Sequence, residues 1–288
     1  MARIAFLGLG VMGAPMAGHL AAAGHELAVY NRSPGKAEAW VAEHRGTRAD
    51  SAAEAAEGAE AVIACVGADR DVEEVTLGPS GAFGAMPQGS LFIDHTTVSA
   101  RLARQLAEEG AGRGIACVDA PVSGGQAGAE KGALSIMCGG SDEAVAAARP
   151  LMQAYGARIV HVGPAGHGQL TKMVNQICIA GTVQGLAEAI HFAKAAGVDS
   201  RKAFEAVSGG AAQSWQMDNR WATMAAGEFD FGFAVDWMRK DLGLTLEEAR
   251  ANGARLPLTA LVDQFYSDLQ AIDAGRQDTS SLIRRLES

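Results

Sequence analysis

The sequence predicts an α/β fold in two parts: a mostly parallel sheet covered by helices, followed by an all-α domain. Short apolar runs alternate with helix-forming segments through the first half of the chain, which is typical of a parallel sheet. A glycine-rich GxGxxG segment directly follows the first apolar run. The alternation stops at Gly163 and Pro164, and helical periodicity continues from there.

The apolar runs and the segments between them place the elements of the first part. We expect strands at residues 3–7, 26–30, 61–66, 91–94, 115–119, 134–138 and 158–162. The intervening segments are rich in Ala, Glu, Leu and Arg, which have high helix propensity. We expect helices at residues 14–23, 34–43, 52–57, 69–75, 100–109 and 142–155.

Residues 168–196 have the spacing of one long helix. Leu170, Val174 and Ile177 recur at intervals that place them on one buried face. No flexible linker precedes this segment, so we expect the two parts to be joined rigidly through it. The predicted domains are an α/β domain at residues 1–164 and an all-helical domain at residues 165–288.

Composition excludes several classes of function. Of the 288 residues, 48% are apolar and 20% are charged, which is typical of a globular chain with a buried core. The net charge of −9 argues against a nucleic-acid partner, which needs a basic surface. Glycine interrupts the apolar start of the chain well before the roughly 20 residues that a membrane span needs. We therefore expect a cytoplasmic protein without nucleic-acid or membrane partners.

Cysteine and histidine spacing predicts no metal site. The four cysteines lie far apart and form no CxxC pair, so free thiols in a reducing compartment are expected. The histidines form no ligand-like pair either. Loop or surface positions are expected for His95, His161, His167 and His191.

The glycine-rich segment has the context of a dinucleotide-binding loop. Strand, loop, helix and second strand follow one another within about 30 residues, which is the Rossmann arrangement. In it, Gly8 permits a tight turn, Gly10 lets the backbone approach a pyrophosphate, and Gly13 allows helix and strand to pack closely. The predicted cofactor-binding residues of this loop are Gly8, Leu9, Gly10, Val11, Met12 and Gly13.

The end of the second strand indicates the preferred cofactor. NAD-binding chains place an acidic residue about 20 positions beyond the loop, where it binds the ribose hydroxyls. This chain has Asn31, Arg32 and Ser33 there instead. Arg32 can offer its planar guanidinium to a 2′-phosphate, with neutral hydrogen bonds from its neighbours. NADP(H) is therefore the preferred cofactor, and use of NAD(H) stays open.

Four motifs in order along the chain are similar to those of the β-hydroxyacid dehydrogenase family. They are GLGVMGAPM at residues 8–16, DAPVSGG at 119–125, GHGQLTKMVN at 166–175 and KDL at 240–242. The resemblance covers residues 3 to 286. It implies an NAD(P)-dependent oxidoreductase with an NADP-binding domain at residues 1–164 and a substrate and dimerisation domain at residues 165–288. Such a protein would assemble as a homodimer or homotetramer.

The resemblance also implies roles for individual residues. Lys172 would be the catalytic general acid and base, and Asn175 would support the substrate and the lysine. Many relatives carry Asn at the position of Gln176, so which of the two amides reaches the substrate is left open. The substrate carboxylate would be held by Ser123, Gly124 and Gly125. Further cofactor contacts are implied for Val66, Thr97 and Lys240.

Physical chemistry agrees with these roles. Hydride transfer to an aldehyde builds negative charge on its oxygen, and a positioned ammonium can stabilise that charge and donate a proton. Asn175 and Gln176 follow Lys172 at i+3 and i+4, which places all three on one helix face. Small residues after a strand end can turn successive N–H groups toward an anion.

The function that the sequence favours is NADP-dependent interconversion of a small hydroxy acid and its aldehyde or keto acid. The substrate types are 3-hydroxyisobutyrate, tartronate semialdehyde, glyoxylate and succinic semialdehyde. An imine reductase is one alternative, although such relatives usually carry Asp or Tyr in place of Lys172. A 6-phosphogluconate dehydrogenase would be longer and would need a basic cluster. A noncatalytic cofactor-binding relative would have lost the lysine.

Overall fold

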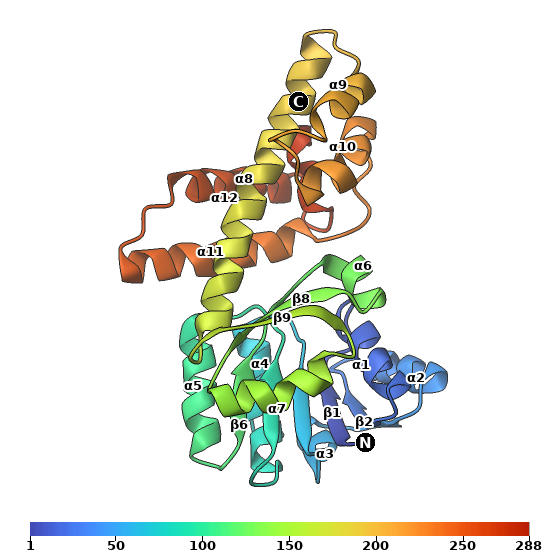
Figure 1. Cartoon of the computed structure of the whole chain (residues 1–288), viewed down its shortest axis with the longest axis vertical. Helices are drawn as coiled ribbons and strands as arrows, with labels where there is room; N and C mark the ends of the chain where they lie inside the picture. Colours follow the sequence, from blue (N-terminus) through green and yellow to red (C-terminus); the bar gives the residue numbers. More distant parts are fainter. Residues whose placement is uncertain (288) are drawn as a thin grey trace. The chain divides into compact units, whose positions relative to one another are not determined.

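A computed structural model describes residues 1–287, which form two compact units (Figure 1). The first unit is Met1–Lys172, and the second begins at Met173. The division lies inside helix α8 (His167–Ala195), a continuous helix whose first turn belongs to the first unit. The boundary expected after residue 164 lies just before the same helix.

Six parallel strands form the first part of the sheet. They are β1 (Arg3–Leu7), β2 (Glu26–Tyr30), β3 (Thr47–Arg48), β4 (Ala61–Ala64), β5 (Leu91–Asp94) and β6 (Ala116–Asp119). Their order across the sheet is β3-β2-β1-β4-β5-β6, which is the order of a doubly wound dinucleotide-binding fold. In such folds the ligand binds where the strand order reverses, beyond the carboxyl ends of β1 and β4.

The sheet continues beyond β6 with antiparallel pairing. Strand β8 (Leu134–Gly139) runs antiparallel to β6 and to β7 (Val122–Ser123), and β9 (Gly156–Gly163) runs parallel to β8. Within residues 1–287 the sheet has nine strands and is mostly parallel, as the sequence predicts. The sequence did not predict β3 and β7, because two residues are too few to show a strand pattern.

Helices cover both faces of the sheet (Figure 1). One face packs against α1 (Gly13–Ala22), α2 (Pro34–Glu43), α6 (Gly125–Glu130) and α7 (Asp142–Met152). The other packs against α3 (Ala52–Ala56), α4 (Asp69–Leu77) and α5 (Ala100–Ala111). Along β1, Phe6 joins the first core and Leu7 the second, since successive strand residues point to opposite faces. Burial on both faces explains why these strands are continuous apolar runs.

The second unit is built from helices around its own core. After α8 come α9 (Ser200–Val207), α10 (Trp215–Ala226), α11 (Val235–Asn252), α12 (Pro257–Ala271) and the 3-10 segment η2 (Thr279–Leu286). Buried Trp221, Met238 and Tyr266 belong to this core. Buried Asp278 fixes the segment before η2, because its carboxylate accepts hydrogen bonds from Arg220 Nε at 3.0 Å and from the Phe233 N–H at 2.9 Å.

Most predicted elements are confirmed, several at both ends. Strands β1, β2 and β5 and helix α2 have the predicted bounds. The largest difference concerns the helix expected over residues 142–155, which ends at Met152. Tyr155 instead lies in the turn before β9, and its side chain is fully buried.

His95 lies in a loop, one of the two positions expected for it, but it is buried and not at the surface. It is only 2% exposed and follows β5 directly. Its Nδ1 lies 2.6 Å from the Ala120 carbonyl oxygen, and its Nε2 lies 2.8 Å from the Tyr155 hydroxyl. A carbonyl oxygen only accepts, so Nδ1 donates and Nε2 accepts the tyrosine proton. Ala120 and Tyr155 are 25 and 60 residues from His95 in the sequence, so sequence spacing did not reveal these hydrogen bonds.

The buried His95 should make stability depend on pH. Burial lowers the pKa of His95 to about 4, so the folded protein keeps it neutral while the unfolded chain binds a proton below pH 6.5. The stability linked to His95 is complete above pH 6.5 and is lost as the pH falls toward 4. Compared with His95→Gln, the parent should lose about 2 kcal/mol more between pH 7.5 and 5.0. Urea denaturation at both pH values measures this difference.

The comparison with the variant is needed because another buried group titrates in the opposite sense. Burial raises the pKa of Asp119 to about 6, so protonation of Asp119 favours the folded state as the pH falls. That contribution is common to the parent and to His95→Gln and cancels in the difference. Equal pH dependence in the two proteins would contradict a buried neutral histidine.

Candidate active site

The glycine-rich loop joins β1 to α1 at the carboxyl end of β1. Gly8 has a φ of +101°, and its N–H donates to the Tyr30 carbonyl at 2.8 Å. A Cβ at Gly8 would overlap the Cys65 carbonyl oxygen, and one at Gly13 would overlap the Gly8 carbonyl oxygen. A Cβ at Gly10 would meet no atom within 4 Å, so the loop is open there. This cradle fits a pyrophosphate at the N-terminus of α1.

Asn31 fixes the same loop from the end of β2. Its Oδ1 accepts the Leu9 N–H at 2.9 Å, and its Nδ2 donates to the Ser33 carbonyl at 3.0 Å. Val11 is 63% exposed, and half-buried Met12 immediately precedes α1. The structure therefore brings the predicted loop residues and the end of β2 together.

Arg32 has an acidic partner in the structure. Its Nη1 lies 2.9 Å from Asp71 Oδ1, and its side chain is 73% exposed. Asp71 lies in the first turn of α4. The predicted phosphate-binding cation is thus beside the loop, and it is paired with a carboxylate that the sequence analysis did not single out.

The loops after β4 and β5 adjoin one another. The Val66 N–H donates to Thr96 Oγ1 at 3.0 Å, and the Thr96 N–H donates to Asp94 Oδ1 at 2.9 Å. Thr97 comes next in the chain. Val66 and Thr97, both expected to contact the cofactor, therefore lie on neighbouring loops at the carboxyl edge of the sheet.

The Asp119 carboxylate caps the N-terminus of α8. Its Oδ1 accepts the Gly166 N–H at 2.7 Å, and its Oδ2 accepts the Gln169 N–H at 3.0 Å. The carboxylate satisfies N–H groups that a helix start leaves unpaired, and its charge complements the helix dipole. Burial raises the pKa of Asp119 to about 6, and the backbone hydrogen bonds act in the opposite direction.

The Gln169 side chain connects the same helical turn to the loop after β5. Its Oε1 accepts the Val98 N–H at 3.1 Å, and its Nε2 donates to the Thr96 carbonyl at 2.8 Å. Gln169 is completely buried. The loop that carries Thr97 and the helix that carries Lys172 are therefore joined by hydrogen bonds.

Lys172 follows Gln169 by about one helical turn on α8. It is buried, with 8% of its surface exposed, whereas most lysines lie at the surface. Asn175 and Gln176 follow on the same continuous helix at i+3 and i+4. A lysine placed one turn after two anchored backbone positions suits chemistry that needs a fixed ammonium.

Ser123, Gly124 and Gly125 lead from β7 into α6. Ser123 pairs with Ser135 of β8, which fixes one end of the segment. Gly124 has a φ of +130° and Gly125 a φ of +61°, conformations that favour glycine. A Cβ at Gly125 would meet no atom within 4 Å, while Leu134 lies 3.2 Å from a Cβ at Gly124. The segment is open at Gly125, as an anion-binding turn requires.

Gln176 makes its hydrogen bonds inside the second unit. Its Oε1 accepts from Asn175 Nδ2 at 2.8 Å, and its Nε2 donates to Asp241 Oδ2 at 2.7 Å. Buried Asp241 also forms an ion pair with Lys240, whose Nζ lies 3.2 Å from Oδ1. Lys240 Nζ lies 5.8 Å from the ring centroid of Trp237. These contacts hold Asn175, Gln176 and Lys240 in one polar network.

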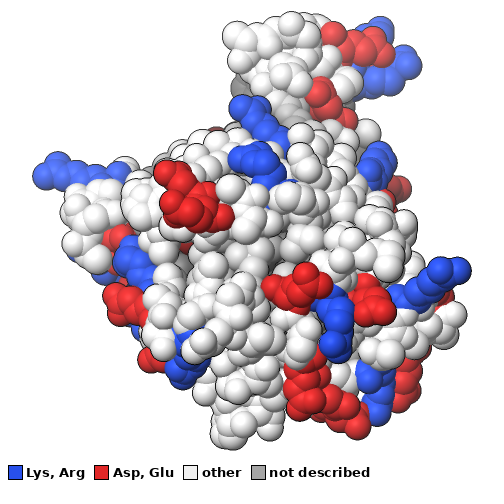
Figure 2. All heavy atoms as spheres, turned by 60° about the horizontal axis from the view of Figure 1, so that its bottom comes forward, with Lys and Arg blue, Asp and Glu red and all other residues white. Residues whose placement is uncertain are grey.

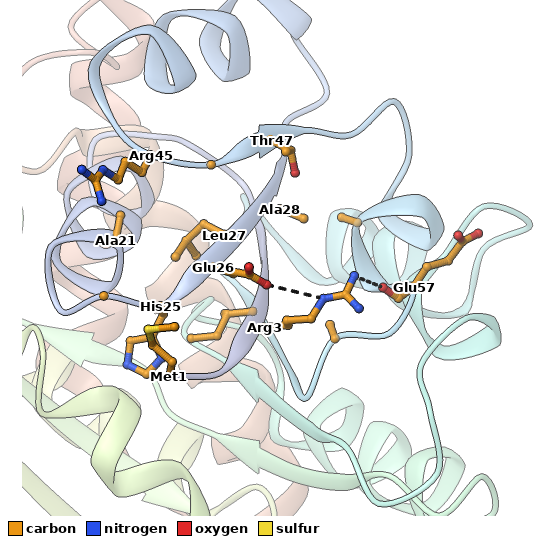
Figure 3. A pocket seen from close by; sticks show the side chains of 15 residues that line it. Met1, Arg3, Ala21, His25, Glu26, Leu27, Ala28, Arg45, Thr47 and Glu57 are labelled. Carbon is orange, nitrogen blue, oxygen red and sulfur yellow. Dashed lines mark hydrogen bonds and ion pairs between the residues drawn. The ribbon is translucent and has the colours of Figure 1, made fainter.

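A cavity of about 530 Å³ lies at the opposite edge of the sheet (Figure 3). It is lined by Arg3 and Glu26, the first residues of β1 and β2, and by Arg45 and Glu57. Arg3 Nε lies 3.9 Å from Glu26 Oε2, and Arg3 Nη2 donates to the Glu57 carbonyl at 3.5 Å. This cavity lies at the amino ends of the strands. Because doubly wound folds bind ligands at the carboxyl ends of their strands, we place the active site there and not in this cavity.

Among residues 1–287 we find no metal-ligand cluster and no membrane-spanning helix, and the face drawn in Figure 2 has no continuous charged patch. On the face drawn in Figure 2, basic and acidic side chains are interspersed, and neither sign forms a continuous patch. No three His, Cys, Asp or Glu side chains of the described chain converge as a metal site would require. None of the helices described here is both long and apolar enough to cross a bilayer.

Four acidic or amide residues of the two units received no role from the sequence, although each bonds to an expected site residue or to the backbone near one. They are Asp71, Asp119, Gln169 and Asp241. Asp241 had a detectable signal, because it lies three residues after buried Met238 and so falls on the buried face of α11. Asp119 ends an apolar run, which also marks burial. Asp71 gave no signal, because only the fold brings it to Arg32.

The comparisons with known proteins cover both units. Residues 3–163 match the NAD-binding domain of 6-phosphogluconate dehydrogenase, and residues 166–286 match the NAD-binding family of NADP-dependent 3-hydroxyisobutyrate dehydrogenase. An uncharacterized oxidoreductase of Shewanella frigidimarina is 56% identical over 100% of this chain and 99% of its own length. A 3-hydroxyisobutyrate dehydrogenase of Pseudomonas aeruginosa is 38% identical over 98% and 97%. The Mycobacterium tuberculosis 3-hydroxyisobutyrate dehydrogenase solved with L-serine has a TM-score of 0.91 at 32% identity, covering 100% of both chains.

Removal of the Gln169 side chain should destabilise the protein. In Gln169→Ala the buried Val98 N–H and Thr96 carbonyl lose their partners, and each such loss costs about 1–3 kcal/mol. We expect a total loss of about 2–6 kcal/mol in urea denaturation. Gln184→Ala is the matched control, since Gln184 is also buried on α8 but bonds only to Glu188 of the next turn, at 2.7 Å. Equal losses in the two variants would contradict the anchoring role of Gln169.

Proposed function

The chain belongs to the β-hydroxyacid dehydrogenase family, and on that basis we propose that it interconverts a small hydroxy acid and its aldehyde or keto acid with NADP(H) as preferred cofactor. Membership makes it an NAD(P)-dependent hydroxyacid dehydrogenase. The cofactor preference, the catalytic lysine and the carboxylate site are our proposals. The observation that carries the catalytic proposal is Lys172, buried one turn after the anchored start of α8.

We assign Lys172 the role of general acid and base. A bound nicotinamide would supply the hydride that reduces the substrate carbonyl. Negative charge then develops on the carbonyl oxygen, and the Lys172 ammonium would stabilise it and donate a proton to it. In the oxidative direction the neutral amine would accept the hydroxyl proton of the hydroxy acid. Burial of Lys172 supports this role, because electrostatic stabilisation is stronger where water is excluded.

Asn175 is the better candidate of the two amides for the substrate contact. Both polar ends of Gln176 are already engaged, one by Asn175 and one by Asp241. Gln176 is also only 1% exposed, whereas Asn175 is half-buried. We therefore propose that Gln176 orients Asn175, and that Asn175 supports Lys172 and the substrate hydroxyl. The Asp241 carboxylate would fix the Lys240 ammonium for its contact with the cofactor.

The substrate carboxylate would bind at Ser123, Gly124 and Gly125. This segment offers N–H groups and one hydroxyl, donors that suit an anion. Open space at Gly125 supports the assignment. The substrate class is therefore a short aldehyde acid or hydroxy acid, rather than a neutral aldehyde.

The NADP(H) preference rests on Arg32. No acidic residue occupies the position after β2 that binds the ribose hydroxyls of NAD in Rossmann folds. Arg32 is largely exposed at that position, so its guanidinium can reach a 2′-phosphate.

We also propose that the second unit mediates assembly into a homodimer or homotetramer. Large apolar side chains of this unit are exposed, among them Phe192 at 71%, Leu258 at 55% and Leu261 at 51%. We propose these exposed apolar side chains as part of the interaction surface, since contiguous exposed apolar patches mark such surfaces in soluble proteins. Light scattering of the purified chain measures the assembly, and a monomeric mass would contradict the proposal.

Replacing Lys172 should abolish turnover with little effect on cofactor binding. We expect kcat to fall by about 10²–10⁴ in Lys172→Ala, since the proton donor is lost. Lys172→Met keeps most of the side-chain volume without the ammonium and should show the same loss. The NADPH dissociation constant, measured by fluorescence titration, should stay within about twofold of the parent. Activity within tenfold of the parent in either variant would contradict the catalytic assignment.

Substrates that lack the carboxylate should react much more slowly. Charge-assisted hydrogen bonds contribute about 1.5–3 kcal/mol each, so kcat/KM for butyraldehyde should be at least about tenfold below that for succinic semialdehyde. Ser123→Ala should reduce the ratio of kcat/KM for succinic semialdehyde to kcat/KM for butyraldehyde. The NADPH dissociation constant should stay unchanged. A valine at Gly124 is a poorer test, because the φ of +130° would strain any side chain there. Equal kcat/KM values for the two aldehydes in the parent would remove the carboxylate site.

A further inference from the structure

The ion pair between Arg32 and Asp71 lies at the position proposed for the 2′-phosphate. Arg32 Nη1 and Asp71 Oδ1 are 2.9 Å apart, and Arg70 Nε lies 3.9 Å from the same carboxylate oxygen. The Arg32 side chain is 73% exposed, while that of Asp71 is 14% exposed. The exposed arginine is therefore the partner that can move, and the aspartate is the fixed one.

The anchoring of α4 explains why Asp71 is fixed. Two residues earlier, Asp69 accepts hydrogen bonds from the Ser99 N–H at 3.0 Å and the Ser99 hydroxyl at 2.6 Å. The preceding loop is held by the bond from the Val66 N–H to Thr96. Asp71 itself lies in the first turn of α4, where the helix dipole favours a carboxylate. A fixed negative charge therefore lies beside the position proposed for the 2′-phosphate.

We propose that Asp71 determines cofactor specificity by competing with the 2′-phosphate for the Arg32 guanidinium. This inference rests on the proposed NADP(H) preference and adds a residue that limits it. NAD(H) carries no 2′-phosphate, so it leaves the Arg32–Asp71 pair undisturbed. NADP(H) has to share or displace the carboxylate and brings a phosphate dianion close to it.

The charges at the site predict the direction of the effect. A phosphate monoester carries about −1.5 to −2 charges at pH 7, and a carboxylate beside it is repulsive. Arg32 remains available to the phosphate because the structure shows Asp71 bonded to Nη1, which leaves other N–H groups of the guanidinium fork. Asp71 therefore weakens phosphate binding without abolishing it. The chain should accept both cofactors, with a smaller preference for NADPH than Arg32 alone would give.

The test measures binding of both cofactors to the whole protein. Asp71→Asn removes the charge and keeps the shape of the side chain. We expect the NADPH dissociation constant to fall about tenfold and the NADH constant to stay within about twofold, both measured by nicotinamide fluorescence titration. Glu74→Gln is the matched control, because it removes the same charge from an exposed position of α4 and should change neither constant.

A fragment experiment isolates the phosphate from the nicotinamide. Adenosine 2′-monophosphate and adenosine 5′-monophosphate are used as competitors of NADH. In Asp71→Asn the 2′-phosphate fragment should compete about tenfold better than in the parent, while the 5′-phosphate fragment should not change. An NADPH dissociation constant that is unchanged or larger in Asp71→Asn would overturn the proposal.

Arg32→Ala separates failure of this inference from failure of the NADP(H) preference. If Arg32→Ala weakens NADPH binding and Asp71→Asn has no effect, the cofactor preference stands and the role of Asp71 is overturned. If Arg32→Ala leaves NADPH binding unchanged, both are overturned. Thermal unfolding of each variant identifies any that fail to fold, and Asp71→Ser then replaces Asp71→Asn in the same titrations.

Discussion

The hydrogen bonds between Asp119 and the start of α8 connect the sheet to the residues of the candidate site. Asp119 ends β6, and its carboxylate accepts the Gly166 and Gln169 N–H groups. The position of Lys172 follows from this contact, because a helix fixes the direction of every residue that comes after its first turn. Gln169 extends the same contact to the loop of Thr97. A carboxylate at a strand end thereby sets the geometry of a lysine on a helix.

Burial of polar groups at the site is compensated by specific partners. Asp119 is 6% exposed, and loss of hydration would be costly without its two N–H donors. His95 is kept neutral and bonded at both ring nitrogens. Gln169 uses both ends of its amide. Networks of this kind allow few alternative arrangements, since each shift leaves a buried group unpaired.

Local sequence patterns predicted the elements whose identity depends on a few neighbouring residues. The bounds of β1, β2 and β5 and the glycine loop were found in this way, because apolar runs and glycine spacing are local signals. The two-residue strands and the short helix α6 were not found, since tertiary pairing rather than propensity forms them. The same holds for side-chain partners such as His95 with Tyr155 and Arg32 with Asp71. Those pairs join residues that the sheet brings together from distant positions.

The glycines of the loop are constrained in two different ways. Packing within the protein requires glycine at two of the positions, whereas the protein itself leaves space for a side chain at the third. Side chains at Gly8 or Gly13 would strike backbone atoms of the protein itself, whereas a side chain at Gly10 would enter open space. A library of single substitutions would therefore respond in two ways. Changes at Gly8 and Gly13 would reduce the yield of folded protein, whereas changes at Gly10, a proposed cofactor contact, would leave the yield intact and weaken cofactor binding. The effect of a Gly10 substitution on cofactor binding can therefore be measured without an accompanying loss of folded protein.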